Sequence, residues 1–345
     1  MSERTKIVAE RGPHPVGVVT TEIESPAGSG RKLPVDVWYP AAAEHAGADA
    51  ADRTTAEHSF GQLHRAIPQA ASATPAAGGF PLLGFSHGNS GLRQQSTFLT
   101  THLASWGCVV VSPDHVGNTF FEMLDVDEEA RVRLHREARE RRPLDLRLSL
   151  DHVLSANGEA RVWPSTDPQR IGVLGHSFGG WTACKIPRID ARVRAVCGLA
   201  PASEKFVGRK AFESGELPLA EGIHSLLIAG RDDVLVDLET SVQPFAARLS
   251  AATQLLVIDA ADHFHFCDGV PVLHENHYSR PRPNQARPTR PLGELLDEAR
   301  MHRIVNGLVT AFFLKVFDGE REPGIGSAEL EALDSAVSDA NRAEP

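Results

Sequence analysis

The residues with the clearest chemical potential lie at positions 175–179, where the sequence reads Gly-His-Ser-Phe-Gly. Apolar, β-favouring residues precede this segment, and residues able to start a helix follow it. A strand that turns sharply into a helix leaves no room for a Cβ beside the turn, which accounts for Gly175 and Gly179. Gly180 stands where the helix must approach the sheet. The segment therefore predicts a G-x-S-x-G nucleophile elbow whose strained backbone presents the hydroxyl of Ser177 in a cleft.

A serine hydroxyl is a weak nucleophile near neutral pH, so it needs a base to take its proton and a carboxylate to orient that base. In enzymes built on such an elbow, the acid and then the histidine follow the serine along the chain. The acid is expected after the buried strand at 223–229, which continues as Gly-Arg-Asp-Asp-Val-Leu. The Gly-x-x-Asp spacing selects Asp233, and Asp232 is the alternative. One of the two aspartates could instead cap a helix near Val236.

The base is expected after the last strand, at 254–258, where a short loop delivers His263. His265 is the alternative, but two residues farther on it would point the other way if the chain were locally extended. A His-x-His pair can also bind a metal ion, but no constellation of acids or cysteines accompanies this pair. The sequence therefore predicts His263 as the base, with no metal site and no cofactor.

An oxyanion hole should supply two backbone N–H groups for the charge that develops on the attacked carbonyl oxygen. One donor is expected from Phe178, the residue after the nucleophile. The other is expected from Asn89, in the loop after the strand at 80–86. Among the remaining histidines, His115 follows a strand and could line the cleft, whereas His176 more simply supports the turn.

Composition excludes several functions. Hydrophobic residues make up 41% of the chain and charged residues 23%, as in ordinary globular proteins. The formal net charge of −10 argues against nucleic acid as a partner, because phosphate binding needs a basic face. No apolar run reaches membrane-span length and no apolar segment follows the N-terminus, so we expect a cytoplasmic protein without stable membrane insertion. The cysteines show no pairing or metal-ligand spacing and are expected as buried thiols: Cys108, Cys184, Cys197 and Cys267.

Strand-like apolar runs alternate with helical segments, which predicts an α/β fold: a mostly parallel central sheet covered by helices on both faces. The alternating runs at 16–23 and 33–39 predict an antiparallel hairpin at its N-terminal end. Pro143 is expected to restart a helix after the charged helical segment that precedes it. Further expected elements are strands at 80–86, 108–112, 193–199, 223–229 and 254–258, helices at 94–106 and 292–316, and a loop at 274–290.

The whole chain, 1–345, is expected to form one domain whose core spans about 16–317. Residues 40–79 are rich in Ala, Thr, Gly and His and predict an insertion, more simply a surface excursion than a substrate lid. The segment 318–345 holds eight acidic residues against two arginines and predicts an acidic C-terminal tail that is mobile at its end.

Together these motifs resemble the α/β-hydrolase superfamily. Within it, the chain is most similar to serine esterases related to bacterial platelet-activating factor acetylhydrolases and to predicted dienelactone hydrolase-like proteins. A weaker similarity, through residues 91–96, runs to cutinase-like polyester hydrolases. The elbow serine departs from true dienelactone hydrolases, whose nucleophile is cysteine, so that activity is not implied. The segments that carry the main resemblance are 85–88, 110–118, 171–180 and 262–268.

The sequence thus predicts a serine hydrolase that cleaves a small-molecule carboxylic ester. Ser177 would attack the ester carbonyl, His263 would pass the proton to the leaving alcohol, Asp233 would orient the imidazole, and water would release the acyl-enzyme. An acyltransferase, an amidase or peptidase, or a perhydrolase would use the same groups, so these remain alternatives. A non-catalytic binding protein on the same fold would be expected to have lost one of the groups. Aromatic residues near the elbow and the base would form either cleft walls or plain core: Phe178, Trp181, Phe264 and Phe266.

Overall fold

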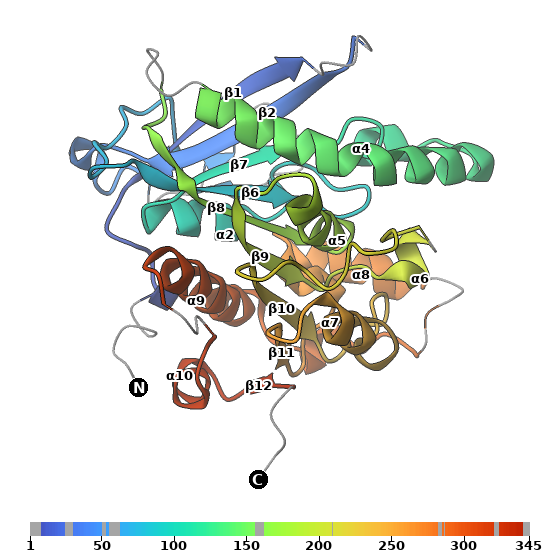
Figure 1. The fold of residues 1–345 in the computed structure, drawn as a ribbon. Coiled ribbons are helices and arrows are strands. Elements are labelled where there is room, and N and C mark those ends of the chain that lie inside the picture. Colours follow the sequence, from blue (N-terminus) through green and yellow to red (C-terminus); the bar gives the residue numbers. More distant parts are fainter. Residues whose placement is uncertain are drawn as a thin grey trace.

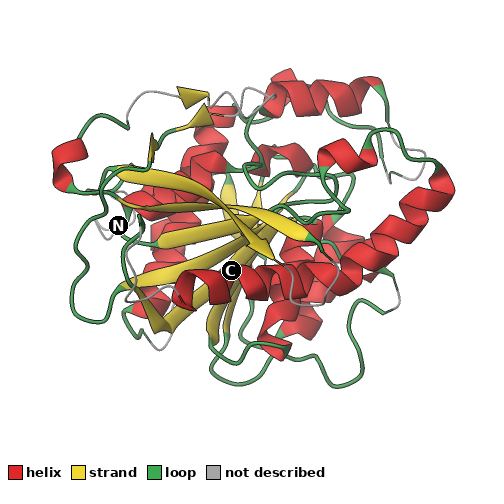
Figure 2. Ribbon diagram, turned by 90° about the horizontal axis from the view of Figure 1, so that it is seen from above, coloured by secondary structure: helices red, strands yellow, loops and turns green. Residues whose placement is uncertain are grey.

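A twisted sheet of ten strands runs through the molecule, with helices on both of its faces (Figures 1 and 2). This computed structural model describes residues 8–24, 30–49, 53–54, 63–155, 162–208, 210–281, 285, 287–320 and 324–340. The strands of the sheet, in chain order, are β1 (Val16–Glu24), β2 (Lys32–Pro40), β5 (Ile67–Pro68), β6 (Phe80–Ser86), β7 (Val109–Pro113), β8 (Thr166–His176), β9 (Val193–Leu199), β10 (His224–Gly230), β11 (Gln254–Ile258) and β12 (Val337–Asp339). Their spatial order is β12-β11-β10-β9-β8-β6-β7-β2-β1-β5.

Six neighbouring strands pair in parallel and form the centre of the sheet: β11, β10, β9, β8, β6 and β7. Their side chains are buried on both faces, which explains why these strands appear in the sequence as continuous apolar runs. Parallel strands all end at the same edge of the sheet, so the loops after β6, β8, β10 and β11 converge there. Every predicted site residue lies just after one of these four strands.

The predicted N-terminal hairpin is present. β1 pairs antiparallel with β2, from Val16 opposite Pro40 to Glu24 opposite Lys32, and β2 then pairs antiparallel with β7. The turn between β1 and β2 falls at residues 25–29, outside the described residues. The hairpin and the parallel strands together confirm the predicted fold class.

Helices cover the two faces of the sheet (Figure 1). One face packs against α2 (Thr97–Ser105) and α9 (Glu298–Phe317), and the other against α4 (Glu128–Ser155), α5 (Phe178–Lys185) and α7 (Gln243–Leu249). Three further helices stand in the loops that follow the carboxyl ends of the parallel strands: α3 (Phe120–Met123), α6 (Glu204–Val207) and α8 (Val270–Ser279). The segment 40–79 contains a short antiparallel pair, β3 (Arg53–Thr54) with β4 (Leu63–His64), and part of it lies outside the described residues.

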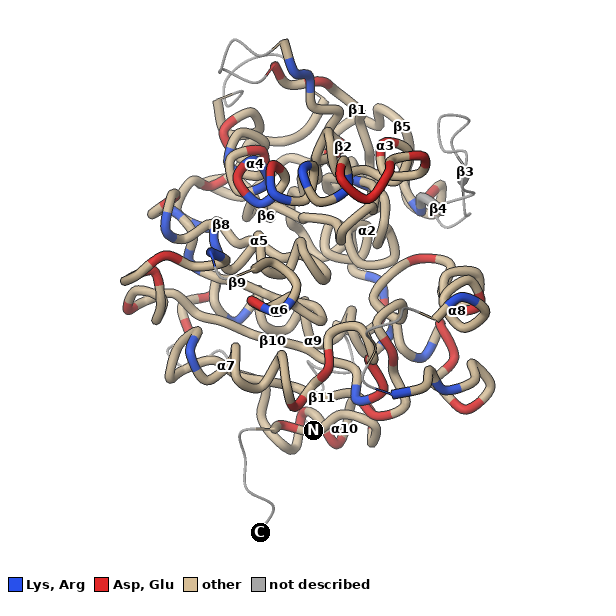
Figure 3. Tube along the Cα trace, turned by 90° about the vertical axis from the view of Figure 1, so that its right-hand side faces the viewer, with Lys and Arg blue, Asp and Glu red and all other residues tan. Residues whose placement is uncertain are grey.

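α4 runs without a break through Pro143, where the sequence predicted a new helix. Proline costs the helix one backbone hydrogen bond, so local preference alone would stop it there. Burial compensates, because side chains on both sides of Pro143, including those of Arg142 and Leu146, pack inside the protein. The outer side of the helix carries charges of both signs (Figure 3), as expected of a solvated face.

The loop predicted at 274–290 begins too early, because α8 extends to Ser279. The buried positions of this helix are Val270, His274 and His277, which have helical spacing. Two of the three are histidines rather than apolar residues. The apolar periodicity that identifies an amphipathic helix in a sequence was therefore missing.

The acidic C-terminal segment adds a helix and a strand to the fold beyond the predicted core of about 16–317, and the end predicted to be mobile lies outside the described residues. It forms α10 (Ser327–Leu333) and the strand β12, which pairs antiparallel with β11 at the edge of the sheet. Leu330, Leu333 and Val337 are buried in the core and hold the segment in place. Residues 341–345 lie outside the described part of the chain.

Candidate active site

Ser177 occupies the tight turn between β8 and α5. Its φ of +55° lies in the left-handed region, which is strained for a residue with a side chain. Two backbone hydrogen bonds hold the turn: Ser177 N–H donates to Leu199 O at 2.9 Å, and Ala202 N–H donates to Ser177 O at 2.8 Å. A Cβ on Gly179 would lie only 1.8 Å from Ser86 O. Close backbone packing therefore explains why the elbow requires a glycine at this position.

His263 and Asp233 form a buried hydrogen bond. The Nδ1 of His263 lies 2.6 Å from Asp233 Oδ2, and the Oδ1 of the same carboxylate accepts the backbone N–H groups of Leu235 and Val236, each at 2.8 Å. The carboxylate is thus fixed by two loop amides, and it fixes the imidazole in turn. With Nδ1 donating, Nε2 is the nitrogen free to accept a proton.

The two alternative residues lie in other contacts. Asp232 accepts a hydrogen bond from Arg290 at 3.0 Å. His265 is buried, with Nδ1 2.7 Å from Asp262 Oδ1 and Nε2 3.0 Å from Leu296 O. The structure therefore brings Asp233 and His263 together, and neither alternative joins them.

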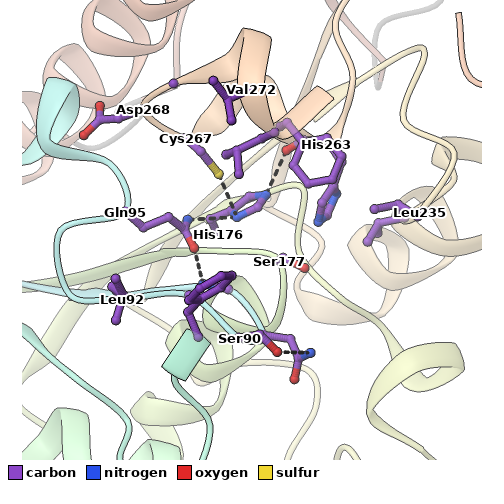
Figure 4. Close-up of a pocket in the computed structure, with 18 of the residues that line it drawn as sticks. Ser90, Leu92, Gln95, His176, Ser177, Leu235, His263, Cys267, Asp268 and Val272 are labelled. Atoms are coloured by element: carbon purple, nitrogen blue, oxygen red, sulfur yellow. Dashed lines mark hydrogen bonds between the residues drawn. The ribbon is translucent and has the colours of Figure 1, made fainter. Parts of the chain in front are cut away.

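A cavity of about 290 Å³ opens over the elbow (Figure 4). Both Ser177 and His263 line it, although no hydrogen bond joins their side chains in the described residues. Such contacts are often long before a substrate binds. Of the four aromatics named from the sequence, Phe264 lines the cavity, whereas the other three are buried core residues. The apolar walls come from loops and from the short helices α3, α6 and α8, where no long apolar periodicity marks them: Leu92, Phe120, Phe206, Leu235, Val236, Val272 and Leu273.

The loop after β6 supplies the second candidate oxyanion donor. Gly88 N–H is already occupied, since it donates to Gln95 Oε1 at 2.7 Å. Asn89 lines the cavity, and in the described structure neither its N–H nor that of Phe178 has an acceptor. These are the two amides named from the sequence, and both are available to a ligand.

A buried chain of hydrogen bonds joins three segments (Figure 4). They are the loop after β6, called here the oxyanion loop, the elbow, and the loop after β11 that carries His263, called here the histidine loop. Gln95 Nε2 donates to His176 Nδ1 at 3.0 Å, and His176 Nε2 donates to the backbone oxygen of His263 at 3.0 Å. Burial holds the pKa of His176 well below its ordinary value, so its ring stays neutral. His176 therefore supports the turn, as predicted, and also lines the cavity. Gln95 lies in the segment 91–96 that resembles polyester hydrolases, but the sequence assigned it no role, because its partner His176 lies in a distant part of the chain.

His115 belongs to a second Ser-His-Asp arrangement, which is buried away from the cavity. Its Nε2 lies 2.8 Å from Ser86 Oγ, and its Nδ1 lies 3.1 Å from Asp145 Oδ2. All three side chains are buried and none lines the cavity. The prediction that His115 could line the cleft is not supported, and these residues instead brace the strand ends behind the oxyanion loop.

Asp262 ties α8 to the histidine loop. Its carboxylate accepts hydrogen bonds from His265 Nδ1 at 2.7 Å, from His274 Nδ1 at 2.5 Å and from Phe264 N–H at 2.9 Å. Burial opposes ionisation, but these donors outweigh it and lower the pKa of Asp262 from 3.8 to about 2.

This lowered pKa predicts a specific acid sensitivity. Because the folded-state pKa lies below the unfolded one, ionised Asp262 contributes stability above about pH 4, and that contribution disappears as the pH falls towards 2. Between pH 6 and pH 3, the free energy of unfolding should fall by about 1 kcal/mol more in the wild type than in Asp262→Asn. Urea unfolding at both pH values measures the difference. An equal fall in the two proteins would contradict this role of Asp262.

The rest of the described chain adds two observations. All four cysteines are buried and unpaired, which confirms the prediction of buried thiols. In the described part of the chain, no helix combines the length and apolarity needed to span a bilayer.

Comparison with known proteins finds a matching hydrolase family and, among the relatives, two proteins whose names refer to a hydrolase and an esterase. Residues 74–278 match the family described as "PETase: PET hydrolase-like". The platelet-activating factor acetylhydrolase of Canis lupus familiaris is 29% identical over 179 residues, which cover 42% of this chain and only 37% of that protein. A ferulic acid esterase from Streptomyces cinnamoneus superposes with a TM-score of 0.65 at 24% identity, covering 97% of this chain and 99% of that one, which shows a shared fold. These comparisons confirm the predicted resemblance to α/β-hydrolase serine esterases.

Proposed function

Because this chain belongs to the PET hydrolase-like family, we propose that it is a carboxylic ester hydrolase that works through an acyl-enzyme on Ser177. The observation that carries the proposal is the Asp233–His263 hydrogen bond of 2.6 Å, whose histidine shares a cavity with Ser177 at the elbow. A serine, a base and an orienting acid are the groups that acyl transfer requires. The family is described as PET hydrolase-like, and the two relatives are named as an acetylhydrolase and a ferulic acid esterase.

The proposed reaction has two halves. His263 Nε2 takes the proton of Ser177 as its Oγ attacks the ester carbon, and the carbonyl electrons move onto the oxygen, which the amides of Phe178 and Asn89 stabilise. The tetrahedral adduct collapses, the bond to the leaving oxygen breaks, and His263 returns the proton to the alcohol. A water molecule then repeats the sequence on the acyl-enzyme and releases the acid.

The cavity favours a small ester with an apolar group. Its volume of about 290 Å³ and its walls of leucine, valine and phenylalanine suit a compact hydrophobic acyl or aryl group. Neither lysine nor arginine lines it, so a substrate with an anionic acyl group would find no cationic partner in the described lining.

Covalent labelling tests the proposed function directly. A fluorophosphonate reacts with an activated serine and should modify this protein at Ser177, as mapped by peptide mass spectrometry. Prior incubation with p-nitrophenyl butyrate, which should be turned over, would slow the labelling. Modification of Ser90, the other serine in the cavity lining, in place of Ser177 would contradict the proposal. So would a folded protein that neither labels nor hydrolyses the ester.

A further inference from the structure

Arg142 is a fully buried arginine that lies directly behind the candidate oxyanion hole. It projects from α4, and its guanidinium donates hydrogen bonds to the backbone oxygen of His87 and, at 2.6 Å, to Asn118 Oδ1. Weaker contacts reach Ser86 Oγ and Thr182 Oγ1, each at 3.3 Å. A buried guanidinium is costly unless its donors are satisfied, and here neutral oxygens satisfy them.

No carboxylate neutralises this charge. In the described residues, Arg142 forms no ion pair, and the nearby Asp145 is already bound by Arg31 at 2.8 Å and by His115 at 3.1 Å. Burial lowers the pKa of Arg142 to about 9, and Asp145 opposes that shift, so the guanidinium remains charged at neutral pH. The positive charge therefore acts in a low-dielectric interior, where its field is weakly screened.

The charge acts on the amide of Asn89 through the adjoining carbonyl. Gly88 O and Asn89 N–H belong to one trans peptide and point in opposite directions. Arg142 Nη1 lies 3.5 Å from Gly88 O, and His87 Nδ1 donates to the same oxygen at 2.7 Å. Burial keeps the pKa of His87 well below its ordinary value, and its Nε2 accepts His115 N–H, so Nδ1 carries the proton. Donors on a carbonyl strengthen the N–H at the other end of its peptide.

The same guanidinium also contacts the other candidate donor residue. Its Cζ lies 4.7 Å from the ring centroid of Phe178 and so holds that residue by a cation–π contact. Arg142 thus contacts both segments that supply the N–H groups of the hole: the loop of Gly88 and Asn89, and the first residue of α5.

We propose that Arg142 is an electrostatic positioning residue, whose buried positive charge orients and strengthens the oxyanion hole as negative charge develops on the substrate oxygen. The inference rests on the proposed ester hydrolysis. It differs from a purely structural role because it requires the charge itself. The effect should therefore appear in the transition state and leave the affinity for a neutral substrate almost unchanged.

The sharpest test neutralises the charge without removing Arg142. Thr182→Asp and Thr182→Asn are matched in size and differ in charge, and both place their side chain beside the guanidinium. We expect kcat/KM for p-nitrophenyl butyrate to be about 10- to 100-fold lower in the aspartate variant, less than the loss from deleting an oxyanion donor. The loss should lie in kcat, with KM nearly equal in the two variants.

A charged adduct provides a second readout. A trifluoromethyl ketone adds to the serine as an anionic hemiketal, whereas the matching amide binds uncharged. Thr182→Asp should bind the ketone more weakly than Thr182→Asn does, by the same factor as its loss in kcat/KM. The two variants should bind the amide with equal affinity. Equal kcat/KM in both variants, or equal losses for ketone and amide, would overturn the inference.

Variants of Arg142 keep the test decisive if Thr182→Asp does not fold. Arg142→Lys retains the charge and should be at least tenfold more active than Arg142→Gln when both are folded, by the same reasoning. Equal activity of these two would overturn the role of the charge while leaving the esterase proposal intact. Wild-type protein without ester turnover would overturn both.

Discussion

Replacing Ser177 with alanine should lower kcat for p-nitrophenyl butyrate by about 10⁴- to 10⁶-fold, the range seen when a serine nucleophile is removed. The change deletes one oxygen and keeps the Cβ, so it adds no clash at the φ of +55° that this position adopts. Residual turnover should reflect the oxyanion amides and substrate binding alone. Initial rates on purified protein, with thermal unfolding to verify the fold, measure the effect.

Ser155→Ala is a suitable control for this variant. Ser155 is exposed at the end of α4 and lies outside the cavity lining, so its replacement should leave turnover within about twofold of the wild type. A folded Ser177→Ala protein that keeps turnover above one-tenth of the wild-type value would refute the acyl-enzyme mechanism. The same preparation should fail to react with a fluorophosphonate.

Changing Asp233 to asparagine should lower kcat by about 10⁴-fold, because it should fix the wrong tautomer of His263. Leu235 N–H and Val236 N–H both donate to Asp233 Oδ1, so an asparagine would keep its carbonyl oxygen there. Its NH₂ group would then replace Oδ2 and donate to His263 Nδ1. That interaction places the ring proton on Nε2, the nitrogen that must accept the proton of Ser177. Rate measurements near pH 8 should show the loss without a matching change in KM.

Asp232→Asn is the matched control, since it makes the same chemical change one residue away. Asp232 pairs with Arg290, whose side chain is 42% exposed, and such pairs contribute little to stability. Its loss should change kcat less than threefold. If Asp232→Asn were instead the inactive variant and Asp233→Asn retained activity, the assignment of the orienting acid would be wrong.

The sequence was informative about the loops of the candidate active site because their requirements are local. An elbow needs small residues on both sides of its serine, and the structure shows Gly179 in contact with backbone that leaves no space for a Cβ. The sequence predicts the acid and the base just after buried strands, and β10 and β11 end shortly before Asp233 and His263. Strand ends are visible in a sequence because parallel strands are continuous apolar runs.

Prediction failed where distant contacts override local preference. α4 continues through Pro143 because its flanking side chains are buried, and α8 forms on buried histidines that no apolar pattern marks. The C-terminal segment is acidic in composition, but its leucines pack against the core and β12 extends the sheet. For α4 and the C-terminal segment the packing partners lie far away along the chain, and for α8 the partner of His274 is a buried carboxylate, Asp262, rather than an apolar residue.

By itself, the sequence determined the fold class, the elbow around Ser177 and the order of the residues proposed to act with it. These features depend on turn sterics and strand patterns, which involve only a few neighbouring residues. The tertiary structure decided which of two aspartates meets His263, which side chains wall the cavity, and which buried groups surround the oxyanion loop. Gln95 and Arg142 are two of these buried groups around the oxyanion loop. Their polar groups acquire a role only when folding removes them from water and brings loops from separate parts of the chain within hydrogen-bond distance.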